Sequence, residues 1–191
     1  SVRDLLDRCP FPALEPALLD LLRVPLSPSV AAAAPGRNVA EGRGCDPVEA
    51  ASLEVLRPYL ERMEGHCPSA PPGGGLADMD GLLEGAEVYA CTASLIRLAC
   101  LRQSRRRLHS SQNSINGQHE EREDGIDDDR GTLGRALTIA GELKSRLTAR
   151  LARWSSTSEK GLSDPGDEAV CPPPGHHRLF LLEHSLEELL A

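Results

Sequence analysis

Histidine and cysteine side chains are the residues of this chain that could bind a metal ion. His66 and Cys67 are adjacent, and His177 and His184 lie two helical turns apart near the end of the chain. The cysteines stand at irregular spacings, namely Cys9, Cys45, Cys67, Cys91, Cys100 and Cys171. Structural zinc sites need paired ligands about two to four residues apart, and the chain has no such pair. We therefore expect no metal ligand and no metal cofactor.

Motifs for nucleophilic or phosphate chemistry are incomplete. The Gly161–Pro165 stretch has proline where a nucleophile elbow needs its second glycine. The glycines at 73–75 are not followed by the lysine and hydroxyl residue of a phosphate-binding loop. Cys91 and Cys100 fall on a predicted apolar helix, where burial raises the pKa of a thiol and makes it unreactive. The prediction is a non-enzymatic protein with no catalytic or cofactor-binding residue.

A cluster of arginines closes the longest predicted helix. It consists of Arg102, Arg105, Arg106 and Arg107. Cations at this end complement the helix dipole, but such a cluster also suits a nuclear import signal or contact with an acidic partner. Arg107 stands three residues before Ser110, as in sites for basophilic kinases, so Ser110 is a candidate phosphosite.

Charge and hydropathy exclude several classes of protein. The 191 residues carry a formal charge of −8, which disfavours nonspecific binding to nucleic acid. No apolar run reaches the roughly 18 residues that a membrane span requires, and we expect no membrane association. The start of the chain has no signal-peptide pattern, so we expect reduced thiols and a nuclear or cytoplasmic location.

The composition favours helices. Hydrophobic residues make up 40% of the chain and aromatic residues only 3%, so leucine and alanine must form most of the core. Both residues favour helix, and no stretch alternates apolar and polar residues as a strand would. We predict an all-α fold, an irregular helical bundle with long disordered linkers.

Apolar periodicity and capping residues locate the helices. They are expected over residues 16–24, 47–64, 79–108, 133–154 and 177–190. Asp46 should cap the second helix, Pro25 should end the first, and Pro58 should kink or interrupt the second. The helices over 79–108 and 133–154 should pack antiparallel, and the helices over 47–64 and 177–190 should cover them.

The chain divides by composition into four parts. Residues 1–45 form a short helix with a Pro/Ala/Gly-rich segment, and residues 46–108 form the first part of the helical core. Residues 109–131 are an acidic, disordered insert. Residues 132–191 complete the core, with a Pro/Gly-rich loop at 155–175.

Two stretches on the longest helix carry a resemblance. Residues Gly85–Tyr89 read Gly-Ala-Glu-Val-Tyr, and Ala93–Leu98 read Ala-Ser-Leu-Ile-Arg-Leu. This pattern resembles the helical regulatory region of fungal zinc-cluster transcription factors, although it is one residue out of step between Tyr89 and Leu95. The resemblance implies a regulatory fragment that reaches DNA only through a zinc-cluster domain absent from this chain.

Three functional hypotheses follow. The first is a non-enzymatic regulatory or protein-interaction module that binds a protein partner, or itself, through helical faces, in line with the resemblance. The second is a helical ligand-binding domain or an enzyme without a known motif, with a pocket near His66, Tyr89 and Cys91. The third is a scaffold fragment of a larger assembly, whose leucine stripes lack their partner.

Overall fold

The described part of the chain is mostly helical. A computed structural model describes residues 2–27, 47–67, 77–114, 127–160 and 174–191, and the predicted linkers between these ranges lie outside the described residues. No strand occurs among the described residues, which confirms the all-α prediction. The elements are α1 (Val2–Arg8), the 3-10 helix η1 (Pro12–Leu14), α2 (Glu15–Asp20), α3 (Arg23–Leu26), α4 (Pro47–Glu64), α5 (Ala77–Ser114), α6 (Asp127–Lys160) and α7 (His177–Leu190).

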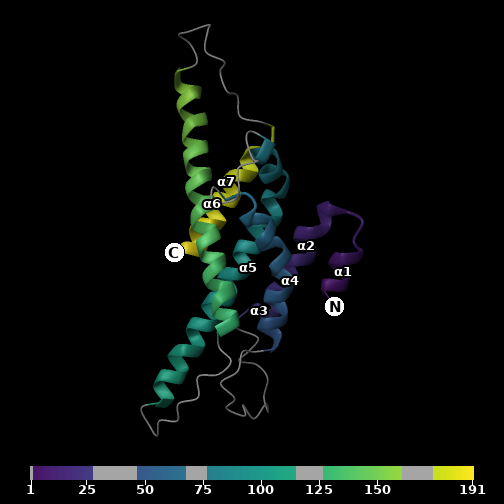
Figure 1. The fold of residues 1–191 in the computed structure, drawn as a ribbon, viewed down its shortest axis with the longest axis vertical. Helices are drawn as coiled ribbons and strands as arrows, with labels where there is room; N and C mark the ends of the chain where they lie inside the picture. Colours follow the sequence, from purple (N-terminus) through teal and green to yellow (C-terminus); the bar gives the residue numbers. More distant parts are fainter. Residues whose placement is uncertain (1, 28–46, 68–76, 115–126, 161–173) are drawn as a thin grey trace.

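Two long helices run along the molecule in opposite directions, and α7 packs against both (Figure 1). Direct contact between α5 and α6 is small, so the predicted antiparallel packing is achieved largely through α7. The last helix can do this because its leucines form one continuous stripe. The stripe consists of Leu179, Leu182, Leu186 and Leu189, all of them buried.

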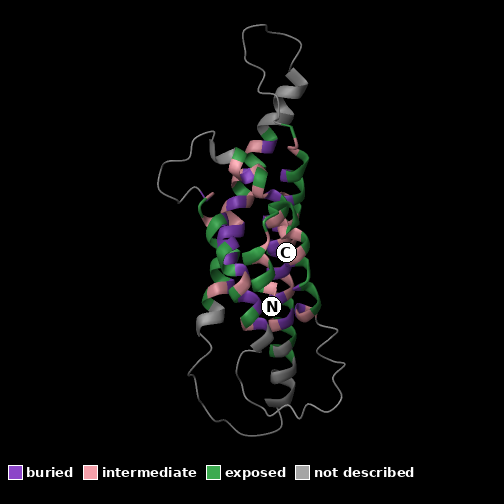
Figure 2. Ribbon diagram, turned by 90° about the vertical axis from the view of Figure 1, so that its right-hand side faces the viewer, coloured by how far each residue is buried: buried purple, intermediate pink, exposed green. Residues whose placement is uncertain are grey.

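The middle of α5 is the centre of the core. It contacts α2, α3, α4 and α7, and it is buried on several sides at Thr92, Ala93, Leu95, Ile96 and Ala99. This confirms the prediction of a central helix, because a helix that is apolar most of the way round needs neighbours on each side. Figure 2 shows buried positions alternating with exposed ones along the other helices, as expected of amphipathic helices.

Both long helices extend beyond their predicted ends into the segment 109–131. The helix α5 continues to Ser114, because no proline or glycine stands between Arg102 and Ser114 to end it. The helix α6 begins at Asp127, six residues before the predicted start at Leu133. It also continues to Lys160, beyond the predicted end at Trp154.

The predicted interruption at Pro58 is wrong, because α4 is one helix from Pro47 to Glu64. A proline inside a helix costs about 3 kcal/mol. Pro58 lies on the exposed side, while Leu56 and Leu60 on either side of it are buried. Core contacts before and after the proline therefore offset its cost, and the helix stays continuous.

The N-terminal segment differs most from the prediction. The sequence suggested one helix from Pro16 to Val24, but α1, η1, α2 and α3 follow one another over residues 2–26. The prediction that Pro25 ends the first helix is also wrong, because Pro25 lies within α3. The N-terminal helix α1 has Asp4 in its first turn and Arg8 in its last, which complements its dipole.

Candidate functional site

Leucines from η1 to α3 form two stripes that face in different directions. The inner stripe consists of Leu19, Leu22 and Leu26, which are buried where α2 and α3 pack against α4 and α5. The outer stripe consists of Leu14, Leu18 and Leu21, spaced four and three residues apart as on one face of a helix. Leu14 is 50% exposed and Leu21 is 51% exposed. Only the inner stripe is used by the fold itself.

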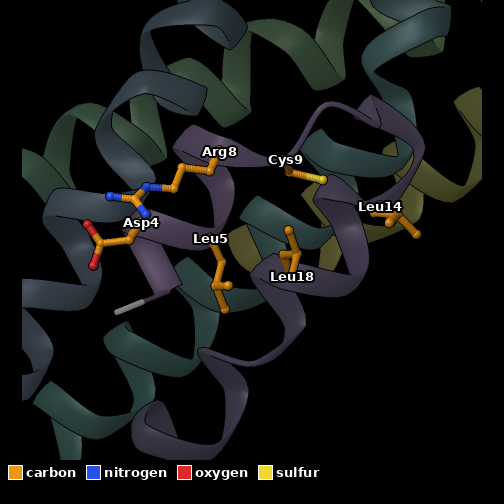
Figure 3. A pocket seen from close by; sticks show the side chains of 6 residues that line it. All are labelled: Asp4, Leu5, Arg8, Cys9, Leu14 and Leu18. Atoms are coloured by element: carbon orange, nitrogen blue, oxygen red, sulfur yellow. The ribbon is translucent and has the colours of Figure 1, made fainter.

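A cleft of about 620 Å³ lies beside the outer stripe, where α1, η1 and α2 meet. Figure 3 shows Asp4 and Arg8 at one end of the cleft, with Leu5 and Leu18 towards its middle. Leu14 lines the other end, and Cys9 lies between Arg8 and Leu14. The cleft is therefore aliphatic along most of its length and carries one acidic and one basic side chain at one end.

We call Leu5, Leu14, Leu18 and Leu21 the N-terminal apolar face. Leu5 is about as exposed as Leu14, and Phe11 and Val24 in the same segment are more exposed still. Leu5, Leu14 and Leu18 line the same cleft, and apolar side chains gathered in one place are more typical of an interaction site than single exposed ones.

Polar contacts hold this segment on the bundle. Arg62 forms an ion pair with Glu15 at 3.6 Å, and the Cys91 thiol donates to the Pro16 carbonyl oxygen at 3.6 Å. Arg3 lies 3.9 Å from Glu54 on α4. The segment that carries the N-terminal apolar face is therefore held against the bundle, and the inner stripe of the same segment is buried in the core.

Arg102 does not belong to an exposed basic cluster. Its side chain is buried, donates a hydrogen bond to the Pro25 carbonyl oxygen, and lies 4.0 Å from the Glu49 carboxylate. The prediction that Arg102 contacts an import receptor or an acidic partner is therefore wrong, because a buried guanidinium engaged with Glu49 and Pro25 is inaccessible. It attaches α3 to α4 and α5 instead.

Two other arginines of the cluster remain exposed. Arg105 faces solvent, and so does Arg107, which also donates to the Gln103 side chain at 3.1 Å. The side chains of Arg106 and Ser110 lie outside the described residues. No described residue of α5 after Arg102 is buried, so the exposed arginines lie on a helix end that extends beyond the core.

The region expected to hold a ligand pocket is packed. His66 Nε2 and the Tyr89 hydroxyl are 3.2 Å apart, and Arg146 donates to the His66 carbonyl oxygen. The Cys91 thiol points instead to α2. The structure thus brings His66 and Tyr89 together as predicted but places Cys91 elsewhere, and the cleft described above lies on the other side of α2.

The thiols of Cys67, Cys91 and Cys100 are poor nucleophiles. Burial, with a further contribution from the Glu142 carboxylate, raises the pKa of Cys67 from 9.0 to about 12. Burial also raises the pKa of Cys91 and Cys100, in line with the predicted inertness. Within the ranges that the structure describes, no three His, Cys, Asp or Glu side chains gather as a metal site would require.

None of the helices that the structure describes is both long enough and apolar enough to cross a membrane. Comparisons of the chain with protein-family models, with curated proteins and with solved structures give no match. Function must therefore be argued from the residues of this chain.

Sequence periodicity alone does not reveal the N-terminal apolar face. On one continuous helix over residues 16–24, at 100° per residue, Leu21, Leu18, Leu22 and Leu19 fall within one arc of about 160°, which predicts a single apolar side. In the structure this segment is divided between α2 and α3, and Leu19 and Leu22 are buried while Leu21 is exposed.

Proposed function

We propose that this protein is a non-enzymatic protein-interaction module that binds an amphipathic helix on the N-terminal apolar face. The observation that carries the proposal is the outer stripe, in which Leu14 and Leu21 are exposed and Leu18 is half-buried, while the inner stripe is buried. An apolar row at this spacing on one helix can pack against the apolar row of a second amphipathic helix. Arg8 at the end of the cleft offers the bound helix a charged contact.

Magnitudes indicate a weak or moderate affinity. Full burial of a leucine side chain contributes about 1.5–3 kcal/mol, so covering the half-exposed Leu5, Leu14 and Leu21 contributes about 1 kcal/mol each. Association itself costs at least about 4 kcal/mol. A partner must therefore also use Phe11 or the polar end of the cleft, and we expect a reversible complex.

The test is affinity capture from an extract of the cells that express the protein. The double variant L14S/L21S removes two anchors, and L181S removes a leucine of similar exposure, 56%, on α7. Proteins retained by the wild type and by L181S but lost with L14S/L21S are the expected result. Identical captured sets from all three chains would contradict the proposal.

A narrower version assigns the module to transcription, in the nucleus. Its support is the resemblance to the regulatory region of fungal zinc-cluster transcription factors, together with the exposure of Arg105 and Arg107. In this version Arg105, Arg106 and Arg107 promote nuclear import, Ser110 is the phosphosite beside them, and DNA contact belongs to another domain.

Imaging a tagged chain tests the nuclear version. Replacing Arg105, Arg106 and Arg107 by alanine should lower the nuclear fraction of the tagged protein. Arg57→Ala, an exposed arginine on α4, is the control. If the distribution of the tagged protein between nucleus and cytoplasm does not change, the assignment to transcription in the nucleus is contradicted. The proposal of an interaction module is unaffected by that result.

A further inference from the structure

We propose that the segment 2–27 is a reversible cover, which occupies a second helix-binding site of the bundle as an internal ligand. This inner site is the surface of α4 and α5 that Leu19, Leu22 and Leu26 cover. When the segment lifts, the inner site becomes open to a helix of another protein with the same leucine spacing. The inference concerns the inner side of the segment, so it goes beyond the proposed function, which concerns the outer side.

The segment contains no helix that is stable on its own. The helices α1, α2 and α3 have 7, 6 and 4 residues, whereas α7, which also packs against α5, has 14. Isolated helices shorter than about 12–15 residues are only marginally stable in water. The short helices therefore keep their structure only while docked, and they should be lost together when the segment lifts. Residues 28–46 connect the segment to α4, a length of chain that lets the segment lift while α4 stays folded.

The inner site is charged where α3 lies on it. The buried polar side chains of the described residues are Glu49, Ser52, Thr92 and Arg102, all of them on α4 or α5. Arg102 lies 4.0 Å from Glu49 and donates to the Pro25 carbonyl oxygen, so this charged pair contacts α3 directly. The buried side chains of α7, in contrast, are all leucines.

This difference makes the segment easier to release than α7. Charged groups are costly to bury, and the pair of Glu49 and Arg102 regains water when α3 lifts. Opening the segment therefore costs less free energy than opening an interface of leucines alone. Permanent interfaces are in general more apolar than transient ones, so α7 has the character of a permanent contact and α3 that of a transient one.

The inner leucines show which occupant fits the inner site. Leu19, Leu22 and Leu26 are spaced three and four residues apart, which is the anchor spacing of a helix that docks by its apolar face. The contact from Arg102 goes to a backbone carbonyl oxygen in the last turn of α3. Every helix offers such a carbonyl at its C-terminal end. A partner helix with the same leucine spacing can therefore replace the segment, and the segment competes with it.

Hydrogen exchange of the full chain tests whether the segment opens as one unit. The amides of Leu19, Leu22 and Leu26 should share one protection factor, roughly 100-fold lower than that of Leu182 on α7. Their exchange should depend only weakly on denaturant, because lifting the segment exposes less surface than global unfolding. A protection factor equal to that of α7 would mean that the segment opens only when the whole bundle unfolds. Three unrelated values would mean that the short helices fray separately, and either result overturns the reversible cover.

A peptide of residues 12–27, fluorescently labelled and added to the full chain, tests the inner site. L19S/L22S in the chain removes two inner anchors, so the chain should bind the peptide about tenfold more tightly than the wild type does. L14S/L21S leaves the inner leucines intact, so this variant should bind the peptide as weakly as the wild type. A peptide that itself carries L19S/L22S should bind none of these chains.

Controls separate this proposal from misfolding and from the proposed function. Circular dichroism and the protection of the Leu182 amide check that L19S/L22S keeps the bundle, and if it does not fold, the hydrogen-exchange result decides alone. Equal affinity of the peptide for L19S/L22S and for the wild type overturns the inner site, as does binding of the serine peptide. Capture of a protein that depends on Leu14 and Leu21 would still support the interaction module in that case.

Discussion

At the scale of single residues, Gly85 and Tyr89 explain the spacing of the Gly-Ala-Glu-Val-Tyr stretch. A helical side chain leans towards the N-terminus of its helix, so the Tyr89 ring lies over the residue four positions before it. A Cβ atom at Gly85 would lie 2.5 Å from Cζ of Tyr89 and 2.8 Å from its hydroxyl. Glycine is needed there because the ring is buried and contacts His66.

Gly85→Ala should therefore destabilise the protein even though alanine is the better helix former. Helix propensity gains about 1 kcal/mol, whereas displacing a buried ring from packed surroundings costs about 1–3 kcal/mol. Gly134→Ala on α6, where nothing lies within 4 Å, should stabilise by about 0.5–1 kcal/mol. Urea unfolding of both variants measures the difference, and equal stabilisation by both would refute this view of Gly85.

Arg102→Ala should be among the most destabilising changes on α5. It would remove the hydrogen bond to Pro25 and leave the Glu49 carboxylate, which is 1% exposed, without its cation. Breaking a buried pair in this way costs about 3–5 kcal/mol. The double variant E49L/R102M should recover much of that loss in the free energy of unfolding. A cost below about 1 kcal/mol for Arg102→Ala would mean that the pair is not buried in solution.

The Cys67 thiol should make stability depend on pH under alkaline conditions. Its pKa rises from 9.0 to about 12 on folding, so between these values the unfolded chain holds fewer protons than the folded one. The free energy of unfolding should then fall as the pH rises from about 9 towards 12. Cys67→Ala should show a shallower fall in denaturant titrations over this window, and an identical slope would contradict the shift.

At the scale of elements, α7 stabilises the bundle because it supplies the apolar surface between α5 and α6. Leu182→Ala, at a fully buried position, should lower the free energy of unfolding by about 2–5 kcal/mol. The adjacent Leu181→Ala, at a mostly exposed position, should cost less than about 1 kcal/mol. Thermal melts of the two variants provide the comparison. Similar losses of stability would contradict the assignment of Leu182 to the buried side and Leu181 to the exposed side of α7.

Helices with a single apolar stripe were predictable from the sequence. The ranges of α4 and α7 match the expected 47–64 and 177–190, because a proline or loop precedes each and one stripe follows. The N-terminal elements were not predictable in the same way. Four short helices over residues 2–26 are stabilised by packing against α4 and α5, which local propensity does not contain.

For the candidate functional residues, too, local sequence patterns predicted only what does not depend on tertiary packing. Arginine spacing suggested a basic cluster, but burial of Arg102 against Glu49 and Pro25 depends on residues more than 50 positions away. Exposure of Leu14 and Leu21 could be inferred only once Leu19, Leu22 and Leu26 were seen to occupy the core side. Sequence periodicity identifies stripes, but tertiary packing decides which stripe is left exposed.

At the scale of the whole molecule, the N-terminal helices form a layer on one side of the bundle (Figure 1). Their inner leucines complete the core, and their outer leucines and the cleft remain open beside them. One short segment thus has both a structural and an interaction role. Substitutions on its outer side should alter binding while leaving the free energy of unfolding nearly unchanged.

Site-specific photo-crosslinking tests the central claim most directly. A photoreactive phenylalanine analogue is placed at Leu14 at the end of η1 in one protein and at Leu181 on α7 in another, since both positions are about half exposed. Irradiation in cells that express the protein should give a discrete adduct from position 14 and none from position 181. An adduct of twice the chain mass would identify the partner as a second copy of this chain. No adduct from position 14, or the same adducts from both positions, would contradict the account of the N-terminal apolar face as a docking surface.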